Sequence, residues 1–346
     1  MNEMTRLERF RSEVPLPGPA DLRTEESRLL DAMAHAATVR PVRGAGRTRR
    51  ARRLRFGLVA GLAAAALTAG VAGVALHQKP AAPPVIHAEN AAAARILTRA
   101  ADNVSEAPEL HPRPDQFLVF TSQTMNTVDS VEQGGRASHY LSRGKRTIWL
   151  PARGDATHGV IEEEVLKPHA YPGRPIPPEA YENIGRHGPE KAVDEDNTAD
   201  YLRTDYAHLS RLPTDPAKMY EHLYIQLGTG PLADARAWDY VGGMLVEAYM
   251  PAAQRAALFR AAAMIHGVTV VRSATDAAGR RGIAVASTWK GLRTEYIFTP
   301  ETYQFLGLRT VVVGPTRVKA PVGSVLTSTA QLSVSVADHA PKVKRR

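Results

Sequence analysis

Few residues in this chain have the chemistry of a binding or catalytic site. The nearest approach to a metal-binding loop is an acidic run with oxygen ligands at alternating positions, the spacing that suits calcium: Asp194, Asp196, Thr198 and Asp200, with Asp205 at the twelfth position. However, Ala199 stands where such a loop needs a glycine, and Asp205 replaces the bidentate glutamate. An acidic helix start is therefore the simpler interpretation, and we predict no metal site here.

The other candidate residues form no catalytic motif. The sequence has no His-x-x-x-His pair, Gly-x-Ser-x-Gly elbow, phosphate loop or dinucleotide fingerprint. The histidines are scattered through predicted loops and helices: His139, His158, His169, His187, His208, His222 and His266. The absence of cysteine excludes disulfides, thiol catalysis and cysteine zinc sites. We predict a protein that is not an enzyme, with no catalytic, cofactor-binding or metal-binding residues.

The segment that organises the chain is apolar and uncharged. Residues 56–77 are predicted to form a transmembrane helix, because a helix of about 20 apolar residues spans a bilayer core of roughly 30 Å. Representative positions are Phe56, Gly57, Gly61, Leu67, Gly70 and Leu76. A buried helix of a soluble domain and a cleaved signal peptide are the competing interpretations. Small residues four apart, as at Gly57 and Gly61, also permit a homodimer through this helix, although an Ala/Gly-rich composition produces such spacings by chance.

Charge on either side of this segment predicts the orientation. Arginines crowd its N-terminal side: Arg49, Arg50, Arg52, Arg53 and Arg55. Because Arg and Lys resist translocation, we expect the N-terminus in the cytoplasm and the C-terminal domain outside the cytoplasmic membrane. The net charge is +9, and the 13 arginines and seven acidic residues before Phe56 contribute +6 of it. The basic character thus lies mainly in the arm, and the folded domain is not predicted to bind nucleic acid.

The cytoplasmic arm, residues 1–55, is predicted to contain one short helix and a disordered, Arg- and Gly-rich stretch. Asp21 caps a helix over residues 23–37. Four apolar side chains fall near one face of it, and nothing else in the arm can cover them: Leu22, Leu29, Leu30 and Met33. This face is marginal in water or docks on a partner. We expect the arginines to contact anionic lipid headgroups more readily than DNA or RNA.

After a Pro/Ala linker, residues 78–88, the exported domain is predicted over residues 89–340, followed by a basic tail, residues 341–346. Helical periodicity favours helices over 89–105, from Pro216, over 237–249 and over 251–265. Strand patterns fall at 117–128, 136–141, 146–150, 158–166, 268–273, 283–289, 293–298, 305–313 and 325–336. Short turns between the strands predict an α+β domain, a curved antiparallel sheet with helices on one face.

Several short stretches resemble a family of uncharacterised single-pass membrane proteins of actinobacteria. In the arm, Phe10-Arg-Ser-Glu-Val-Pro15 and Arg28-Leu29-Leu30 carry the likeness. In the exported part it rests on Thr147-Ile-Trp149-Leu-Pro151, Leu212-Pro-Thr-Asp-Pro216, Ala256-Ala-Leu258 through Gly267-Val268, Thr275-Asp-Ala-Ala-Gly-Arg280 and Phe298-Thr-Pro-Glu-Thr302. Position 299 is Thr where Asp is expected. These motifs are turns, caps and core positions, so the resemblance implies no catalytic residue.

The resemblance implies a protein encoded beside an extracytoplasmic-function sigma factor, and hence an outer sensor domain with an inner arm that holds a sigma factor. The arm departs from zinc anti-sigma domains, since a chain without cysteine lacks their His-x-x-x-Cys-x-x-Cys pattern. The layout of the exported domain is also similar to the curved-sheet lipoprotein-carrier fold. That similarity implies the alternative function, an anchored domain that binds a lipid or acyl chain.

Overall fold

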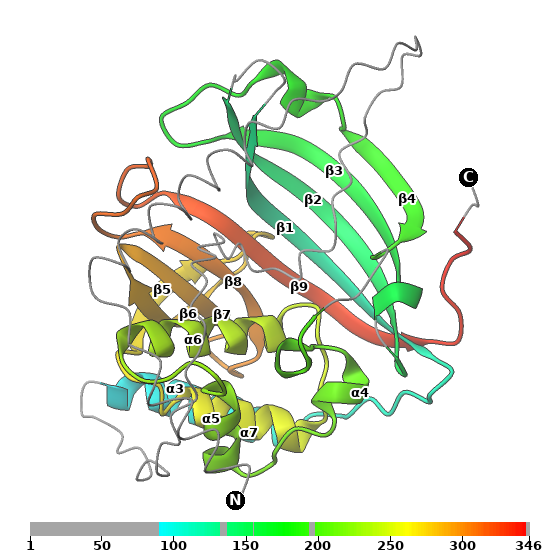
Figure 1. The fold of residues 1–346 in the computed structure, drawn as a ribbon, viewed down its shortest axis with the longest axis vertical. Coiled ribbons are helices and arrows are strands. Elements are labelled where there is room, and N and C mark those ends of the chain that lie inside the picture. Colours follow the sequence, from blue (N-terminus) through cyan, green and yellow to red (C-terminus); the bar gives the residue numbers. More distant parts are fainter. Residues whose placement is uncertain (1–89, 132–136, 155, 194–197, 344–346) are drawn as a thin grey trace, which may run out of the picture. The chain divides into compact units, whose positions relative to one another are not determined.

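The described strands form one antiparallel sheet of nine strands. The computed structural model describes residues 90–131, 137–154, 156–193 and 198–343. The strand order is β4-β3-β2-β1-β9-β8-β7-β6-β5, so most neighbours in the sheet are also neighbours in sequence (Figure 1). The strands are β1 (Phe117–Val131), β2 (Ala137–Pro151), β3 (Val160–Ala170), β4 (Gly185–Lys191), β5 (Thr269–Thr275), β6 (Arg281–Trp289), β7 (Leu292–Phe298), β8 (Phe305–Val312) and β9 (Val325–Ala337).

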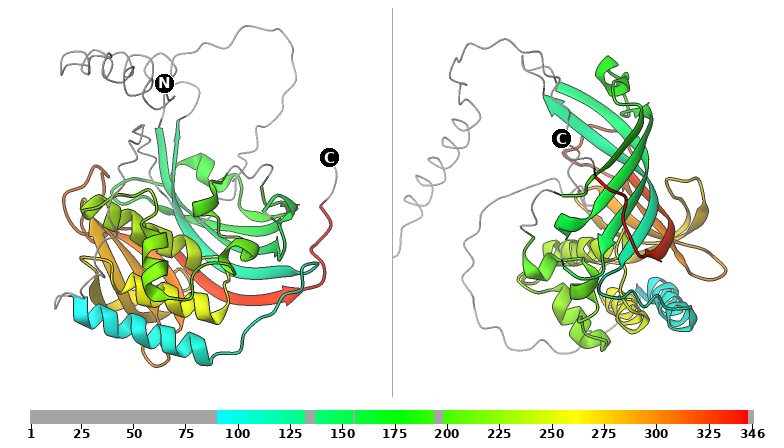
Figure 2. Two further views of the ribbon diagram at one scale, coloured as in Figure 1. Left: turned by 60° about the horizontal axis from the view of Figure 1, so that its bottom comes forward. Right: turned by 90° about the vertical axis from the view of Figure 1, so that its right-hand side faces the viewer.

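Of the described helices, α3 precedes β1 and the others lie between β4 and β5 in sequence; they gather near the β5–β8 part of the sheet (Figure 1). They are α3 (Ala91–Glu106), α4 (Tyr206–Leu209), α5 (Pro216–Leu223), α6 (Pro231–Leu245) and α7 (Ala252–Ala262), with short 3-10 turns at Ala156–His158, Pro178–Tyr181 and Asp200–Leu202. Figure 2 shows α3 and α7 side by side, as their packing requires. An antiparallel sheet with a few helices confirms the predicted α+β class.

Two parts of the sheet differ from the prediction. The break expected between strands 136–141 and 146–150 is wrong, because β2 runs through Arg143 and Gly144 and pairs continuously with β1 from Pro151 to Ala137. Inside the strand, the Glu163 side chain lies where a Cβ of Gly144 would be. Strand β4 falls in a stretch where no strand was predicted, because its glycines and proline conceal a strand pattern.

Local capping chemistry explains where the helices begin and end. The Asp215 carboxylate accepts a hydrogen bond of 3.0 Å from the Lys218 N–H, and Pro216 follows it in the first turn, which confirms the predicted start of α5. Helix α6 begins at Pro231 and ends at Leu245, so the predicted range 237–249 was wrong at both ends. The chain leaves the helix at Val246, which is extended at φ −91° and ψ 121°, and the next residue, Glu247, is left-handed at φ +52°.

The main hydrophobic core lies between the helices and the β5–β8 part of the sheet. Trp238 of α6 stacks on Tyr296 of β7, with ring centroids 4.3 Å apart, and its indole N–H donates 3.0 Å to the Thr294 carbonyl. Phe259 of α7 meets Phe298 of β7 edge to face at 5.7 Å. Fully burying side chains of this size contributes roughly 2–3 kcal/mol each, so these contacts fix the helices on the strands.

The opposite face of this part of the sheet is covered by its own hairpin. Asp276 and Arg280, in the turn between β5 and β6, form an ion pair of 2.7 Å. The Arg280 guanidinium also donates 2.9 Å hydrogen bonds to the carbonyls of Leu306 on β8 and Gln331 on β9. The hairpin therefore curls over β8 and β9 instead of extending away from them.

We predict that the turn between β6 and β7 tolerates no side chain at Gly291. This glycine has φ +78°, and a Cβ there would lie 2.2 Å from the Pro315 carbonyl oxygen. Gly279 is the matched control, since it has φ +84° with open space around its Cβ position. By chemical denaturation, Gly279→Ala should cost about 1 kcal/mol, for the backbone conformation alone. Gly291→Ala should cost about 3 kcal/mol or more; equal losses would contradict the close approach.

Candidate functional site

The residues predicted to anchor the chain, set its topology and bind a partner all precede residue 90 and lie outside the described residues. These are the transmembrane positions of 56–77, the arginines from Arg49 to Arg55, and the apolar face of Leu22, Leu29, Leu30 and Met33. The linker 78–88 and residues 344–346 of the tail lie there too. Within residues 90–343, as far as described, no helix is long and apolar enough to cross a membrane.

The acidic run considered as a calcium loop is only partly described, since Asp194 and Asp196 lie outside the described residues. Asp205 is engaged elsewhere. It caps α4 by accepting the His208 N–H at 3.0 Å, and it forms an ion pair of 2.7 Å with Arg203. Nowhere in the described parts of the chain do three or more His, Asp or Glu side chains group to hold a metal ion.

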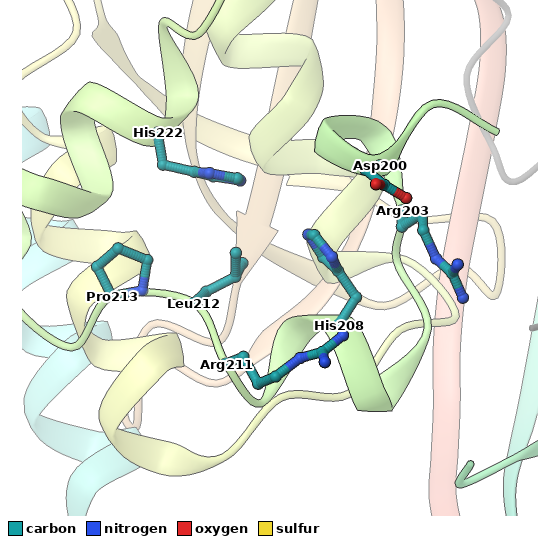
Figure 3. A pocket seen from close by; sticks show the side chains of 7 residues that line it. All are labelled: Asp200, Arg203, His208, Arg211, Leu212, Pro213 and His222. Atoms are coloured by element: carbon teal, nitrogen blue, oxygen red, sulfur yellow. The ribbon is translucent and has the colours of Figure 1, made fainter. Parts of the chain in front are cut away.

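A pocket of about 380 Å³ opens beside α4 and α5. Figure 3 shows the imidazoles of His208, from α4, and His222, from α5, turned toward the same space above Leu212. Their ring centroids are 6.3 Å apart. The full lining is Asp200, Arg203, His208, Arg211, Leu212, Pro213 and His222. The structure thus brings together two histidines that the sequence left scattered.

The pocket is built by two short helices and the bend between them. Asp205 caps the single turn of α4 and so fixes the place of His208 three residues later. Leu212-Pro213 then reverses the chain, and the Asp215 cap starts α5, whose last turn carries His222. Buried Leu209, Met219 and Leu223 hold both helices against the core. The bend thus brings together two imidazoles that are fourteen positions apart in the sequence.

The two imidazoles are poised to remain uncharged at neutral pH. Burial lowers the pKa of His208, and the Arg203 and Arg211 charges lower it further while Asp205 and Asp200 oppose them. Burial, then the neighbouring His208, lowers the pKa of His222. The His208 Nε2 atom is buried and has no hydrogen-bond partner among the described residues. Such an atom carries a desolvation penalty of about 1–3 kcal/mol that a bound ligand would relieve.

The charged groups of the pocket differ in availability. The Arg203 guanidinium points away from the imidazoles in Figure 3 and is paired with Asp205. Arg211 and Asp200 lie at the exposed rim. Two imidazoles with one rim cation and one rim anion can form hydrogen bonds with a polar molecule.

A second polar cluster joins the helices to the other part of the sheet. Glu247, which follows α6, accepts two hydrogen bonds from Arg146 of β2, at 2.6 Å from Nε and 2.5 Å from Nη2. The Ser122 hydroxyl of β1 donates to the same carboxylate. The Arg146 and Glu247 side chains are only 11% and 4% exposed. Burial raises the pKa of Glu163 beside them; Arg146 opposes this shift, and Glu247 adds to it.

One further titratable group lies in the helix layer. Asp239 of α6 follows Trp238, and burial raises the pKa of its carboxyl from 3.8 to about 6. Buried carboxyls with raised pKa values occur at functional sites and in structural networks alike. Sequence reasoning missed Asp239, Glu247 and the histidine pair, because burial at single positions leaves no periodic pattern.

Comparisons with protein families, with curated proteins and with solved structures found no match for this chain.

We predict that Glu247→Gln destabilises the protein by about 3–5 kcal/mol, because it leaves the Arg146 guanidinium buried without its counter-charge. The double variant Arg146→Met, Glu247→Gln removes both charges and should lose less stability than the single variant. Urea denaturation measures both free energies of unfolding. If the double variant loses as much stability as Arg146→Met and Glu247→Gln lose together, the two side chains are not coupled.

We also predict a pH-dependent effect of Asp239→Asn. Folding into a site with pKa about 6 stabilises the neutral carboxyl relative to the unfolded chain at 3.8, so stability is highest below pH 3.8 and falls as the pH rises through about 6. The asparagine variant should be more stable than the parent by up to about 3 kcal/mol at pH 7.5, and by much less near pH 4.5. Thermal unfolding at both pH values tests this; equal gains would contradict it.

Proposed function

We propose that the protein is a single-pass protein of the cytoplasmic membrane, whose exported domain senses a small molecule and whose cytoplasmic arm relays the signal to a sigma factor. The observation that carries the sensing role is the histidine pocket, where a buried imidazole nitrogen has no partner in the described part of the chain. The uncharged segment 56–77 and the arginines before it support the anchor and its orientation. The resemblance to actinobacterial membrane proteins supports the sigma factor as partner.

The packing of the helices supports a relay from the pocket toward the anchor. Helix α5, which carries His222, packs on α7, and α7 packs on α3. Asn90, at the start of α3, is 3% exposed, and its side-chain amide donates 3.0 Å to the Ile265 carbonyl after α7. Because α3 directly follows the segment that leads from the anchor, a displacement of α5 has a packed route to that segment.

The alternative is a membrane-anchored domain that binds a lipid or acyl chain. It rests on the similarity of the layout to the lipoprotein-carrier fold. The described pocket has histidine, arginine and aspartate around a small apolar floor, so it favours a compact polar ligand over an acyl chain. Under this alternative the arm is not needed for function, and lipid should remain bound to the protein during purification.

The test is affinity capture of the tagged full-length protein from cells, after cross-linking. In one variant Leu22, Leu29, Leu30 and Met33 become Ser, and every arginine is kept. In the control, Arg49, Arg50, Arg52 and Arg53 become Lys, which keeps the charge. We expect a sigma factor with the parent and the Lys control, and a loss of at least about tenfold with the Ser variant, because the apolar face is the docking surface.

Equal recovery from the parent and the Ser variant would overturn the relay and leave the arm as a topology determinant. Lipid that copurifies with the arm-deleted protein, in the absence of any captured sigma factor, would favour the carrier alternative.

A further inference from the structure

We propose that the pocket between His208 and His222 binds a small oxyanion, a phosphate or carboxylate group, and takes up protons as it binds, so that affinity rises as the pH falls. The inference rests on the proposed function in one respect, that this pocket is the ligand site of the sensing domain. It adds the chemical class of the ligand and the condition that controls its binding.

The geometry fits an oxyanion held between two ring nitrogens. Ring centroids 6.3 Å apart leave room for one small group that accepts a hydrogen bond from each imidazole. His208 Nε2 has no hydrogen-bond partner among the described residues, and Figure 3 shows the two imidazoles turned toward the same space. Because this nitrogen is buried, the His208 ring must turn slightly toward the pocket before a ligand oxygen can accept its hydrogen bond. That bond would satisfy an atom that folding has already removed from water.

The charges around the pair make the pocket neutral until the imidazoles are protonated. The charged groups that face His208 are Asp200 from the 3-10 turn, Asp205 and Arg203 before α4, and Arg211 after it. The formal charges of these two carboxylates and two guanidinium groups cancel. His222, from α5, is faced by His208. With both rings neutral the pocket has no excess charge, and it gains one positive charge with each proton.

Protonation and anion binding therefore favour each other. Burial and mutual proximity lower the pKa of both imidazoles, so a proton enters the empty pocket only below the usual pH range of histidine. A bound anion stabilises each imidazolium and raises its pKa, and by linkage a lower pH strengthens anion binding. A metal ion would behave oppositely, because it needs neutral imidazoles and competes with protons. The nearby guanidinium of Arg211 also opposes a cation.

The test is isothermal titration calorimetry on the full-length protein in detergent. Inorganic phosphate, acetate and glycerol phosphate are titrated separately, at about pH 5.5 and about pH 7.5. Each titration is run in two buffers of different ionisation enthalpy, which gives the number of protons taken up. We expect at least one anion to bind about tenfold more tightly at the lower pH, with net proton uptake. Tighter binding of glycerol phosphate than of inorganic phosphate would identify a phosphate monoester, such as a lipid headgroup, as the source.

The variants separate this site from general anion binding. His222→Gln keeps an N–H donor but cannot take up a proton, so it should bind the anion with a weaker pH dependence and less proton uptake. Arg211→Gln, at the exposed rim, should weaken binding several-fold without unfolding the protein. His111→Gln is the matched control, because His111 is exposed and outside the pocket. Unchanged near-UV circular dichroism confirms that each variant is folded.

Three results would overturn the proposal: affinity that does not change with pH, equal binding and proton uptake by the parent and His222→Gln, or proton release on titration with Zn²⁺ in place of anion binding. None of these bears on the capture of a sigma factor by the arm. A relay that survives while anion binding fails would therefore leave the proposed function standing with a different ligand.

Discussion

The contact between Trp238 and Tyr296 determines where the whole helix layer sits. Tyr296 is completely buried in the middle of β7; its hydroxyl donates to the Trp238 carbonyl, and its ring stacks on the indole. The approach is possible because Gly242 has no side chain, and a Cβ there would lie 2.8 Å from the tyrosine oxygen. With α6 fixed in this way, the chain must leave it at a defined point, where the left-handed Glu247 meets Arg146 on the far part of the sheet. The position of α7, and of α5 upon it, follows from these contacts.

Ion pairing with arginine distinguishes several buried carboxylates from the imidazoles of the pocket. Three buried carboxylates are each matched by arginine: Glu295 by Arg293 and Arg309, Asp276 by Arg280, and Glu247 by Arg146. Buried charges of this kind must be paired, because an isolated one is costly in a low-dielectric interior. The His208 imidazole departs from this pattern, since its buried nitrogen has no partner among the described residues. Ser328 Oγ and Gln331 Oε1 are also buried without a partner among the described residues, but of these three residues only His208 lines the pocket.

Turn and cap residues made much of the fold predictable from the sequence. The pocket could not be predicted in this way. The strands after residue 268 follow from short turns such as that at Gly291, and α5 follows from Asp215 and Pro216, because these residues act within a few positions of themselves. Gly144 misled for the same reason: a glycine that usually marks a turn lies here inside a strand, beside the Glu163 side chain of another strand. The pair of His208 and His222 depends on tertiary packing of two short helices, which no local pattern encodes. The proline-rich bend at 212–216 was the one signal that the chain reverses between them.

The position of the pocket gives the proposed ligand a packed route to distant parts of the domain. Helix α5 is only eight residues long, and buried Met219 and Leu223 press it on α7. Protein interiors are close-packed, so a short helix that shifts around a ligand cannot absorb the movement locally and must displace its neighbour. Beyond α7 lies α3, whose N-cap residue Asn90 is bonded to the Ile265 carbonyl. Under the proposed function, a proton and an anion that enter together between the two imidazoles act at the start of a packed route to the N-terminal segment.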